Sequence, residues 1–328
     1  MSGSGRPRVV RVAVEIGMIE LVRYSPSRQE EWNALIGRSR NGTFLFHRQY
    51  MDYHADHFED DSFLVMKHGK LEAVIPGNRS ENTFYSHQGL TYGGVISTEH
   101  ILTRDMLEIF ERLREIVRDQ GCSTMVYKPV PSIYHVMPAE EDLYALFRCG
   151  ARLVSRQISS AIVRPRTIPL IESRKGGIRK AKQFDIAVRE SEDWGAFWEI
   201  LSETLESRFG RKPVHSREQI EMLHHRFPAN IKLHVAVKDN RVVSGAVLYL
   251  TGKVVHVQYI ASSEAGRHTG ALDLLFDGLM NDAYADIPVF EFGTSTENGG
   301  QVLNENLIFQ KEGFGGRGIV YDTYEWTL

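Results

Sequence analysis

Residues 254–318 read VVHVQYIASSEAGRHTGALDLLFDGLMNDAYADIPVFEFGTSTENGGQVLNENLIFQKEGFGGRG, and this stretch decides the fold of the chain. At its start, Val255 and Val257 alternate with polar neighbours, which is the two-residue period of a strand. Apolar residues at helical spacing follow and predict a helix over residues 269–283. The stretch therefore begins with a strand that leads into a helix.

The second part of the stretch repeats this order. A short apolar run at residues 289–292 predicts a buried strand, and residues 302–312 predict a helix that Gly313 ends. Strand, helix, strand and helix in succession form a crossover unit, and open α/β sheets bind ligands where such strands end. Polar residues gather at the end of the second strand: Glu291, Thr294, Ser295, Thr296, Glu297 and Asn298.

Two phrases of this stretch resemble a known family. They are FEFGTS at residues 290–295, and NEN at residues 304–306 followed by KEGFG at residues 311–315. Both resemble the C-terminal half of a GNAT acyltransferase and, more narrowly, the FemAB-like, tandem-GNAT group. The resemblance implies an α/β (α+β) fold class, with two tandem GNAT-like domains whose mixed sheets are flanked by helices.

The length of 328 residues favours two domains. We expect an N-terminal extension or tag at residues 1–17, an N-terminal GNAT-like domain at residues 18–165, and a C-terminal, donor-binding GNAT-like domain at residues 166–328. The order of predicted elements in the second domain is repeated loosely in the first. The expectation of a duplicated fold rests on that order and on the resemblance, because the residues themselves show no repeat.

The composition excludes several classes of protein. The net charge of -3 gives no general attraction to nucleic acid or membranes. Two isolated cysteines, Cys122 and Cys149, form neither a disulfide framework nor a metal set. No apolar run approaches the roughly 18 residues of a membrane helix. We therefore expect a cytoplasmic enzyme with no membrane span and no metal.

Glu291 and Lys311 are the candidate catalytic residues. An amine must lose a proton when it attacks an acyl group, and a carboxylate among apolar neighbours suits that task. Glu291 would otherwise pair with a basic side chain and fix its loop. Lys311 lies near a helix end, where the helix dipole alone favours a cation. The resemblance implies instead that this lysine helps to hold the acceptor.

The loop at residues 263–271 is where the resemblance places the diphosphate of an acyl-CoA donor. Backbone N–H groups at a helix start suit an anion, although Thr269 could equally be an ordinary helix cap. The family pattern Arg/Gln-x-x-Gly-x-Gly/Ala is matched by Arg267 and Gly270, but Leu272 stands at its last, small position. Some FemAB-like branches use aminoacyl-tRNA as the donor. The candidate cofactor-binding residues are Arg267, His268, Thr269 and Gly270.

Two further groups are candidate substrate-binding residues. Hydroxyl and amide side chains after the second strand could hold a phosphate or a sugar hydroxyl, or could cap the helix that follows. In the first half, a loop rich in glycine and aromatic residues would face a cleft between the halves. Together they comprise His87, Gln88, Tyr92, Thr294, Ser295, Asn298 and Asn304.

The densest group of positive charges follows the expected joint between the halves. It could bind the phosphates of tRNA or of a nucleotide-linked acceptor, whereas a solvated helix face is the commoner role of such a group. No aromatic residues are interleaved with these charges, which weakens the nucleic-acid interpretation. The group is Arg174, Lys175, Arg179, Lys180 and Lys182.

The resemblance implies an N-acyltransferase that uses an acyl-CoA, such as acetyl-CoA, to acylate an amine. The acceptor would be an amino sugar, a nucleotide-linked sugar or a peptide, in cell-envelope or polysaccharide biosynthesis. One alternative is a peptidyltransferase of FemABX type that uses aminoacyl-tRNA. The other is a binding module that kept the fold without catalysis. The sequence specifies neither the acceptor nor the oligomeric state.

Overall fold

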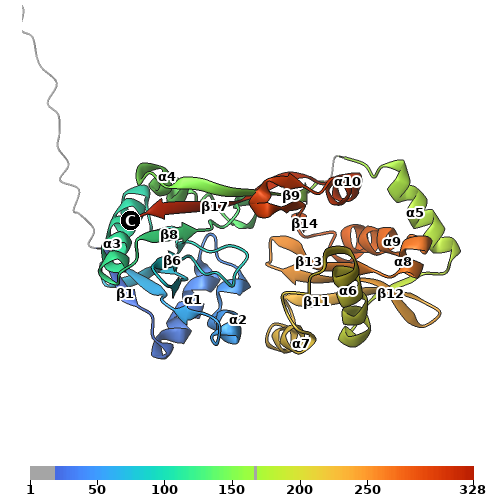
Figure 1. Ribbon diagram of the computed structural model, residues 1–328, viewed down its shortest axis with the longest axis horizontal. Coiled ribbons are helices and arrows are strands. Elements are labelled where there is room, and N and C mark those ends of the chain that lie inside the picture. Colours follow the sequence, from blue (N-terminus) through green and yellow to red (C-terminus); the bar gives the residue numbers. More distant parts are fainter. Residues whose placement is uncertain (1–18, 166–167) are drawn as a thin grey trace, which may run out of the picture.

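The computed structural model describes residues 19–165 and 168–328, so the expected extension at residues 1–17 lies outside the described residues. Two α/β halves lie next to each other along the long axis of the molecule (Figure 1). The expected joint between them, at residues 165–166, lies partly outside the described residues, and this domain boundary stays a prediction.

The N-terminal half combines a separate four-stranded sheet, in the order β1-β3-β4-β7, with strands of a larger sheet. Helix α3 is the amphipathic helix expected from the sequence. Its apolar face is buried in the core of this half, and Asp105 caps its start by accepting a 2.8 Å hydrogen bond from the Leu102 N–H. The helices are α1 (Gln29–Arg38), α2 (Arg48–Met51), α3 (Thr103–Asp119) and α4 (Glu141–Arg148). The strands are β1 (Ile19–Arg23), β2 (Glu59–Asp60), β3 (Phe63–Lys67), β4 (Lys70–Ile75), β5 (Asn78–Ser80), β6 (Thr83–Tyr85), β7 (Ile96–Ser97) and β8 (Thr124–Tyr127).

The C-terminal half has helices on both faces of its sheet. Alternate residues of β13 face opposite sides: Val254 packs in the cluster with α6 and α7, and Val255 packs in the cluster with α9. The helices are α5 (Glu172–Gln183), α6 (Trp194–Phe209), α7 (Arg217–Arg226), α8 (Glu264–Thr269), α9 (Ala271–Gly278) and α10 (Glu305–Gly313). The strands are β10 (Ala187–Glu190), β11 (Ile231–Lys238), β12 (Arg241–Leu250), β13 (Val254–Ser262), β14 (Val289–Thr294), β15 (Thr296–Glu297) and β16 (Val302–Leu303).

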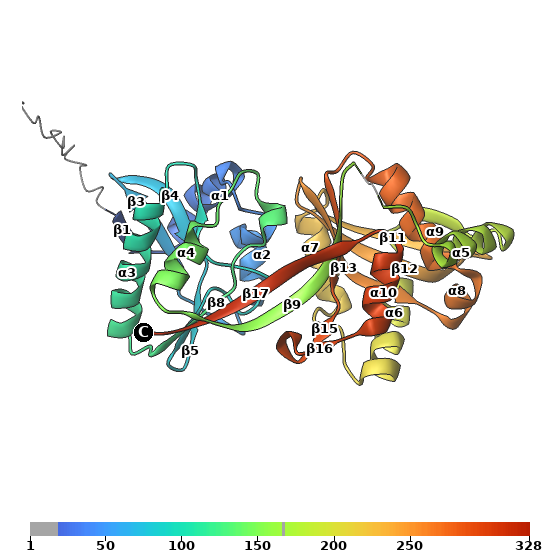
Figure 2. The same cartoon turned by 90° about the horizontal axis from the view of Figure 1, so that it is seen from above.

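Two long strands, β9 (Arg152–Val163) and β17 (Arg317–Thr327), join the halves. They pair antiparallel with each other, while the end of β9 also pairs with β14 and the end of β17 with β8. The result is one 11-stranded sheet in the order β10-β11-β12-β13-β14-β9-β17-β8-β6-β5-β2. Figure 2 shows both strands crossing the middle of the molecule. The last strand of the chain thus completes the first half, where Trp326 is buried beside Phe110.

The structure differs from the expected elements at two places in residues 254–318. The loop expected at residues 263–271 contains the short helix α8, which Ser263 caps through a 3.1 Å hydrogen bond from the Gly266 N–H. The last helix begins at Glu305 rather than at residue 302, because residues 302–303 form β16 and pair with β15. None of the helices in the described part of the chain combines the length and apolar character that a membrane span requires.

Candidate active site

The parallel pairing of β13 with β14 is short, and its end defines the candidate site. It comprises Val254 with Val289, Val255 with Phe290, and His256 with Glu291, although β13 continues to residue 262. The ladder between β12 and β13 is irregular just beyond this point. The carboxyl end of a parallel strand pair is where α/β sheets usually bind ligands.

Glu291 is fully buried at this point and is surrounded by hydrogen-bond donors. Its Oε1 accepts a 2.8 Å hydrogen bond from the Gly293 N–H and another from the Ser159 hydroxyl, and its Oε2 is bonded to His256 Nδ1. Burial by itself would raise the pKa of Glu291. The charge and hydrogen bond of His256 and the hydrogen bond of Ser159 outweigh burial, so the pKa lies below its usual value. Glu291 is therefore a stabilised carboxylate.

His256 is the residue through which this carboxylate can act. A carboxylate only accepts hydrogen bonds, so its contact with Nδ1 assigns a ring proton to Nδ1. In neutral imidazole the Nε2 lone pair is then available, and no residue of the described chain forms a hydrogen bond with Nε2. The side chain is 13% exposed, whereas Glu291 is fully buried. The pair is a carboxylate–histidine dyad that can accept a proton at Nε2.

The strand pattern at the start of residues 254–318 includes His256, but it gives no pairing of this residue with Glu291. The two residues are 35 positions apart and become neighbours only through the register of the parallel strands. Alternation predicts on which side of the sheet each residue lies. It does not predict which residues of neighbouring strands stand opposite each other, because that depends on the strand register.

Two tyrosines complete the polar cluster around the dyad. The Tyr134 hydroxyl lies 3.5 Å from Glu291 Oε2, 3.4 Å from His256 Nδ1 and 2.8 Å from the Tyr321 hydroxyl. Burial raises the pKa of Tyr134 well above its usual value, and Tyr321 and Glu291 raise it further. Both hydroxyls therefore stay protonated and can donate. Sequence reasoning did not single out either tyrosine, and no sequence signal connects them to Glu291.

Lys311 joins the cluster from α10. Its Nζ donates 2.7 Å hydrogen bonds to the carbonyl oxygens of Gly293 and Thr294. The side chain is buried, which lowers the pKa of Lys311 to about 8, although the nearby Glu291 counteracts part of the shift. The N–H of Gly293 binds Glu291 and its carbonyl binds Lys311. The two residues thus meet at one glycine, and their catalytic role stays a prediction.

The predicted cofactor-binding residues are engaged in local structure. The Arg267 guanidinium donates a 2.6 Å hydrogen bond to the Ser262 carbonyl, and Thr269 is buried with its hydroxyl bonded to the Ala265 carbonyl at 2.9 Å. His268 lies edge-on to Phe184 at 5.7 Å between ring centroids. Thr269 thus does not cap α9, and its hydroxyl is not directed at a ligand.

Helix α5 covers the start of α9. Gly270 has a φ of 75°, and a Cβ at this position would lie 2.5 Å from the Gly177 carbonyl oxygen of α5. Arg174 of α5 forms a 2.6 Å ion pair with Asp273 in the first turn of α9. Figures 1 and 2 show α5 beside α8 and α9. In this arrangement α5 occupies the helix start at which a diphosphate would bind.

The positive charges of α5 divide into two groups. Arg174 is half-buried in its ion pair with Asp273, and Lys175 pairs with Glu172 at 2.8 Å. Arg179, Lys180 and Lys182 are exposed, and Lys180 lies over the Phe184 ring. The exposed members form a positive surface on the outer side of α5.

Of the predicted substrate-binding residues in the C-terminal half, only Thr294 touches the cluster, through the bond of its carbonyl to Lys311. Asn304 caps α10 by accepting a 3.1 Å hydrogen bond from the Leu307 N–H. Ser295 is fully buried, and Asn298 lies exposed in the turn after β15. Of the two roles predicted for these side chains, Asn304 takes that of a helix cap.

The predicted substrate-binding residues of the N-terminal half separate into two places. Tyr92 lies against Tyr134 with a ring-centroid distance of 4.7 Å, which brings it to the dyad cluster. Gln88 exchanges two 2.7 Å hydrogen bonds with Asn78, and His87 is buried beside Phe58. A role for His87 and Gln88 in binding substrate stays a prediction.

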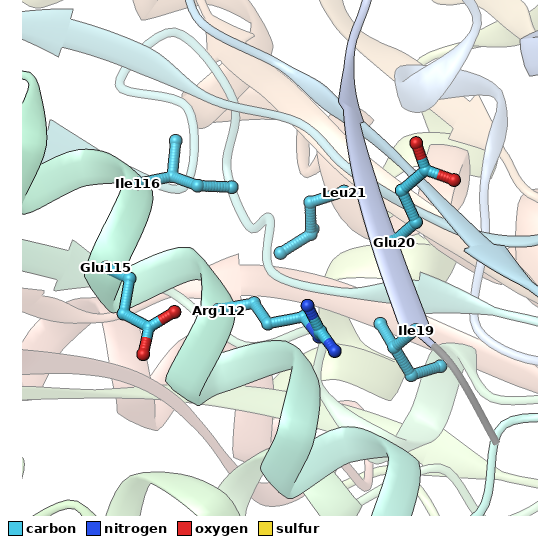
Figure 3. A pocket seen from close by; sticks show the side chains of 6 residues that line it. All are labelled: Ile19, Glu20, Leu21, Arg112, Glu115 and Ile116. Carbon is cyan, nitrogen blue, oxygen red and sulfur yellow. The ribbon is translucent and has the colours of Figure 1, made fainter. Parts of the chain in front are cut away.

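Two surface hollows differ in their relation to this cluster. One of about 260 Å³ lies between β1 and α3, at the outer end of the N-terminal half, where Arg112 extends toward Ile19 (Figure 3). The other, of about 600 Å³, lies between α6, α7 and His57 of the N-terminal half. The helices that line the second hollow cover the sheet face that carries His256. Neither hollow is lined by Glu291, His256 or Lys311, and the second is related to the dyad through this shared sheet face.

Comparisons with known proteins support the fold described above. Residues 172–298 match the family described as Acetyltransferase (GNAT) domain. The chain resembles the FemAB-like tandem GNAT acyltransferases. FemX aligns over 94% of this chain and 97% of its own, with 12% identity and a TM-score of 0.67. The fold class expected from the sequence is confirmed.

Two further tandem GNAT structures are similar over nearly the whole chain. L-PGS from Bacillus licheniformis aligns over 95% of this chain and 94% of its own, with 12% identity and a TM-score of 0.60. A tandem GNAT protein from the clavulanic acid biosynthesis pathway aligns over 94% and 98%, with 11% identity and a TM-score of 0.54. At these identities the similarity shows the fold. No curated protein matches the sequence.

Proposed function

We propose that this protein is an N-acyltransferase in which His256 accepts the proton of an attacking amine and Glu291 holds His256 in place. The observation that carries the proposal is the dyad at the end of the β13–β14 pairing, with its Nδ1 bonded to a carboxylate. The GNAT domain match supports the reaction class.

The chemistry follows from the two side chains. The amine nitrogen attacks the carbonyl carbon of the activated acyl group, and a carbon–nitrogen bond forms while the bond to the leaving group breaks. The amine loses one proton, which His256 Nε2 takes. Glu291 stabilises the resulting imidazolium through the Nδ1 hydrogen bond. No covalent enzyme intermediate is needed.

One observation favours aminoacyl-tRNA over acyl-CoA as the donor. The acyl-CoA predicted from the sequence would place its diphosphate at the start of α9, where Gly177 and the Arg174–Asp273 ion pair already lie. The exposed charges of α5 beside this place suit a longer polyanion. The resemblance to the FemAB-like group, in which some branches use charged tRNA, supports the same choice.

The acceptor would approach from the face shared by the two halves. The hollow of about 600 Å³ there is lined by apolar residues such as Trp198 and by charged residues such as Lys212. A mixed lining of this kind suits an amine on a sugar or a peptide. The candidate acceptors therefore remain an amino sugar, a nucleotide-linked sugar and a peptide.

A transfer assay with two labelled donors tests the proposal. The full chain is mixed with radiolabelled acetyl-CoA or with a pool of radiolabelled aminoacyl-tRNAs, together with hydroxylamine, amino sugars, nucleotide-linked amino sugars and short peptides. We expect an N-acyl product from the tRNA pool that His256→Asn abolishes. Product from acetyl-CoA alone would restore the acyl-CoA interpretation. Product from neither donor would support the non-catalytic binding module.

A binding measurement separates the donors without turnover. A ligand at a hundredfold its dissociation constant stabilises the folded state by about 2.7 kcal/mol. We expect a rise in melting temperature with a charged-tRNA mimic and none with CoA. A rise with CoA alone would show that α5 moves away from α9.

A further inference from the structure

Residues 129–138, here called the strap, leave the N-terminal half after β8 and reach the dyad of the other half. Both halves hold this segment. The Val136 N–H donates to the Arg40 carbonyl at 2.8 Å, and the Arg40 guanidinium donates to the Pro138 carbonyl at 3.1 Å. From the C-terminal half, Lys253 Nζ donates to the His135 carbonyl. Contacts from both halves thus hold the strap directly after Tyr134.

Tyr134 is the strap residue that enters the dyad. Its side chain is buried, and its ring packs against Tyr92. Its hydroxyl lies within 3.5 Å of Glu291 Oε2 and within 3.4 Å of His256 Nδ1, and it forms a 2.8 Å hydrogen bond with the Tyr321 hydroxyl. A residue 157 positions away in sequence therefore reaches the carboxylate of the other half.

Several titratable groups face this hydroxyl. Glu291 and His256 lie on β14 and β13, Tyr321 on β17, and Tyr92 in the N-terminal half. Lys311 of α10 acts on the same carboxylate from the other side. Burial keeps the pKa of Tyr134 and of Tyr321 far above neutrality, so both hydroxyls are donors throughout the working range.

We propose that Tyr134 is a positioning residue for the dyad: its hydroxyl, supplied by the other half, orients the Glu291 carboxylate toward His256 Nδ1 and stabilises the state in which Nε2 is free to accept a proton. This inference rests on the proposed role of His256. It assigns to the N-terminal half a part in the chemistry, and the two halves then form one composite site.

The direction of the expected pH effect follows from the charges. With neutral His256 the dyad carries one net negative charge, and after it binds a proton it carries none. A donor to the carboxylate stabilises the negative state more than the neutral one. Removing the Tyr134 hydroxyl therefore makes the dyad bind its proton at higher pH.

The test compares Tyr134→Phe with Tyr50→Phe in the full chain. Tyr50 is a matched control, because it too is a buried tyrosine of the N-terminal half bonded to a tyrosine hydroxyl of the other half, Tyr249, at 3.2 Å. NMR of the labelled histidine rings, assigned with His256→Asn, follows the titration of the dyad in each variant. We expect the midpoint to rise by about half a unit to one unit in Tyr134→Phe and to stay unchanged in Tyr50→Phe.

Two further readouts complete the test. Tyr321→Phe removes a hydroxyl that bonds Tyr134 and also acts on Glu291, and it should move the midpoint in the same direction. In transfer assays, the acid limb of the pH–rate profile should move to higher pH in Tyr134→Phe. The inference is overturned if Tyr134→Phe titrates as wild type or if Tyr50→Phe shifts equally. The NMR titration needs no turnover, so an inactive protein with the expected shift would refute the proposed function alone.

Discussion

Each half contains a parallel strand pair, β6–β8 in the first and β13–β14 in the second, and the crevice of an α/β fold lies at the carboxyl end of such a pair. Each crevice contains a lysine that burial holds at a pKa of about 8: Lys128 in the first and Lys311 in the second. Both amines bond main-chain carbonyls, Lys128 those of residues 88 and 90 and Lys311 those of residues 293 and 294. In both halves a lysine thus holds main-chain carbonyls at or just after the end of a strand.

The crevices differ in what surrounds their carboxylates. Next to the first, Asp142 is bonded to the Tyr127 hydroxyl at 2.8 Å, and burial raises the pKa of Asp142 to about 6. In the second, Glu291 is held ionised and is bonded to His256. The first carboxylate serves the packing of its half, whereas the second is coupled to a ring nitrogen that can take a proton. A duplicated fold can therefore keep chemistry in one copy and use the other as support.

The largest expected effect comes from exchanging the two carboxylates for amides. Glu291→Gln removes the charge that stabilises the imidazolium, and we expect kcat to fall about a thousandfold, within the range of general-base catalysis. Asp142→Asn should leave kcat within about threefold, because that group touches only its own half. Steady-state transfer rates check both. If Glu291→Gln kept wild-type activity, the proposal that Glu291 acts in catalysis and Asp142 does not would be contradicted.

Asp142 should also give the N-terminal half a pH-dependent stability. Its pKa is raised from 3.8 to about 6 on folding. The contribution of protonated Asp142 to the free energy of unfolding is therefore complete below pH 4 and is lost as the pH rises through about 6. Two pKa units correspond to roughly 3 kcal/mol. Urea unfolding of wild type and Asp142→Asn at pH 4 and pH 7 measures how the free energy of unfolding of each protein depends on pH. A pH-independent difference between the two proteins would contradict it.

The smallest expected effect is the difference in kcat between variants of Lys311 and Lys128. Lys311→Met removes two hydrogen bonds and the positive charge near Glu291, so we expect kcat to fall about tenfold. Lys128→Met removes the equivalent bonds without a carboxylate partner, and it should lower the melting temperature with little change in kcat. Calorimetry and kinetics on both variants test this pair. Equal kinetic losses would mean that both crevices take part in catalysis.

The sequence predicted the elements of the site better than their pairing. Alternation and helical spacing located the strands before and after α9, because these signals depend on neighbouring residues. Glu291 was a candidate through its place on the second strand, and Lys311 through the family resemblance. The bond between His256 and Glu291 depends on strand register, and the approach of Tyr134 depends on the path of the strap. Neither the His256–Glu291 bond nor the approach of Tyr134 leaves a pattern in the neighbouring sequence.

The same reason explains the other differences. The last strand lies within the expected C-terminal domain, and its end pairs with β8 of the N-terminal half, where Tyr324 stands opposite Tyr127, about 200 residues earlier in the chain. The covering of Gly270 by Gly177 is likewise a packing contact between helices. Gly177 and Gly270 are residue types common in loops, and here they allow α5 and α9 to pack closely.

The most direct test of the account is the single-turnover rate of acyl transfer by His256→Asn, measured with the donor that the wild-type chain uses and with circular dichroism to confirm the fold. Asparagine can still donate a hydrogen bond to Glu291, but it has no basic nitrogen. We predict a rate about a thousandfold or more below wild type. A rate equal to wild type would show that the proton leaves the amine by another route and that the dyad is not the centre of the reaction.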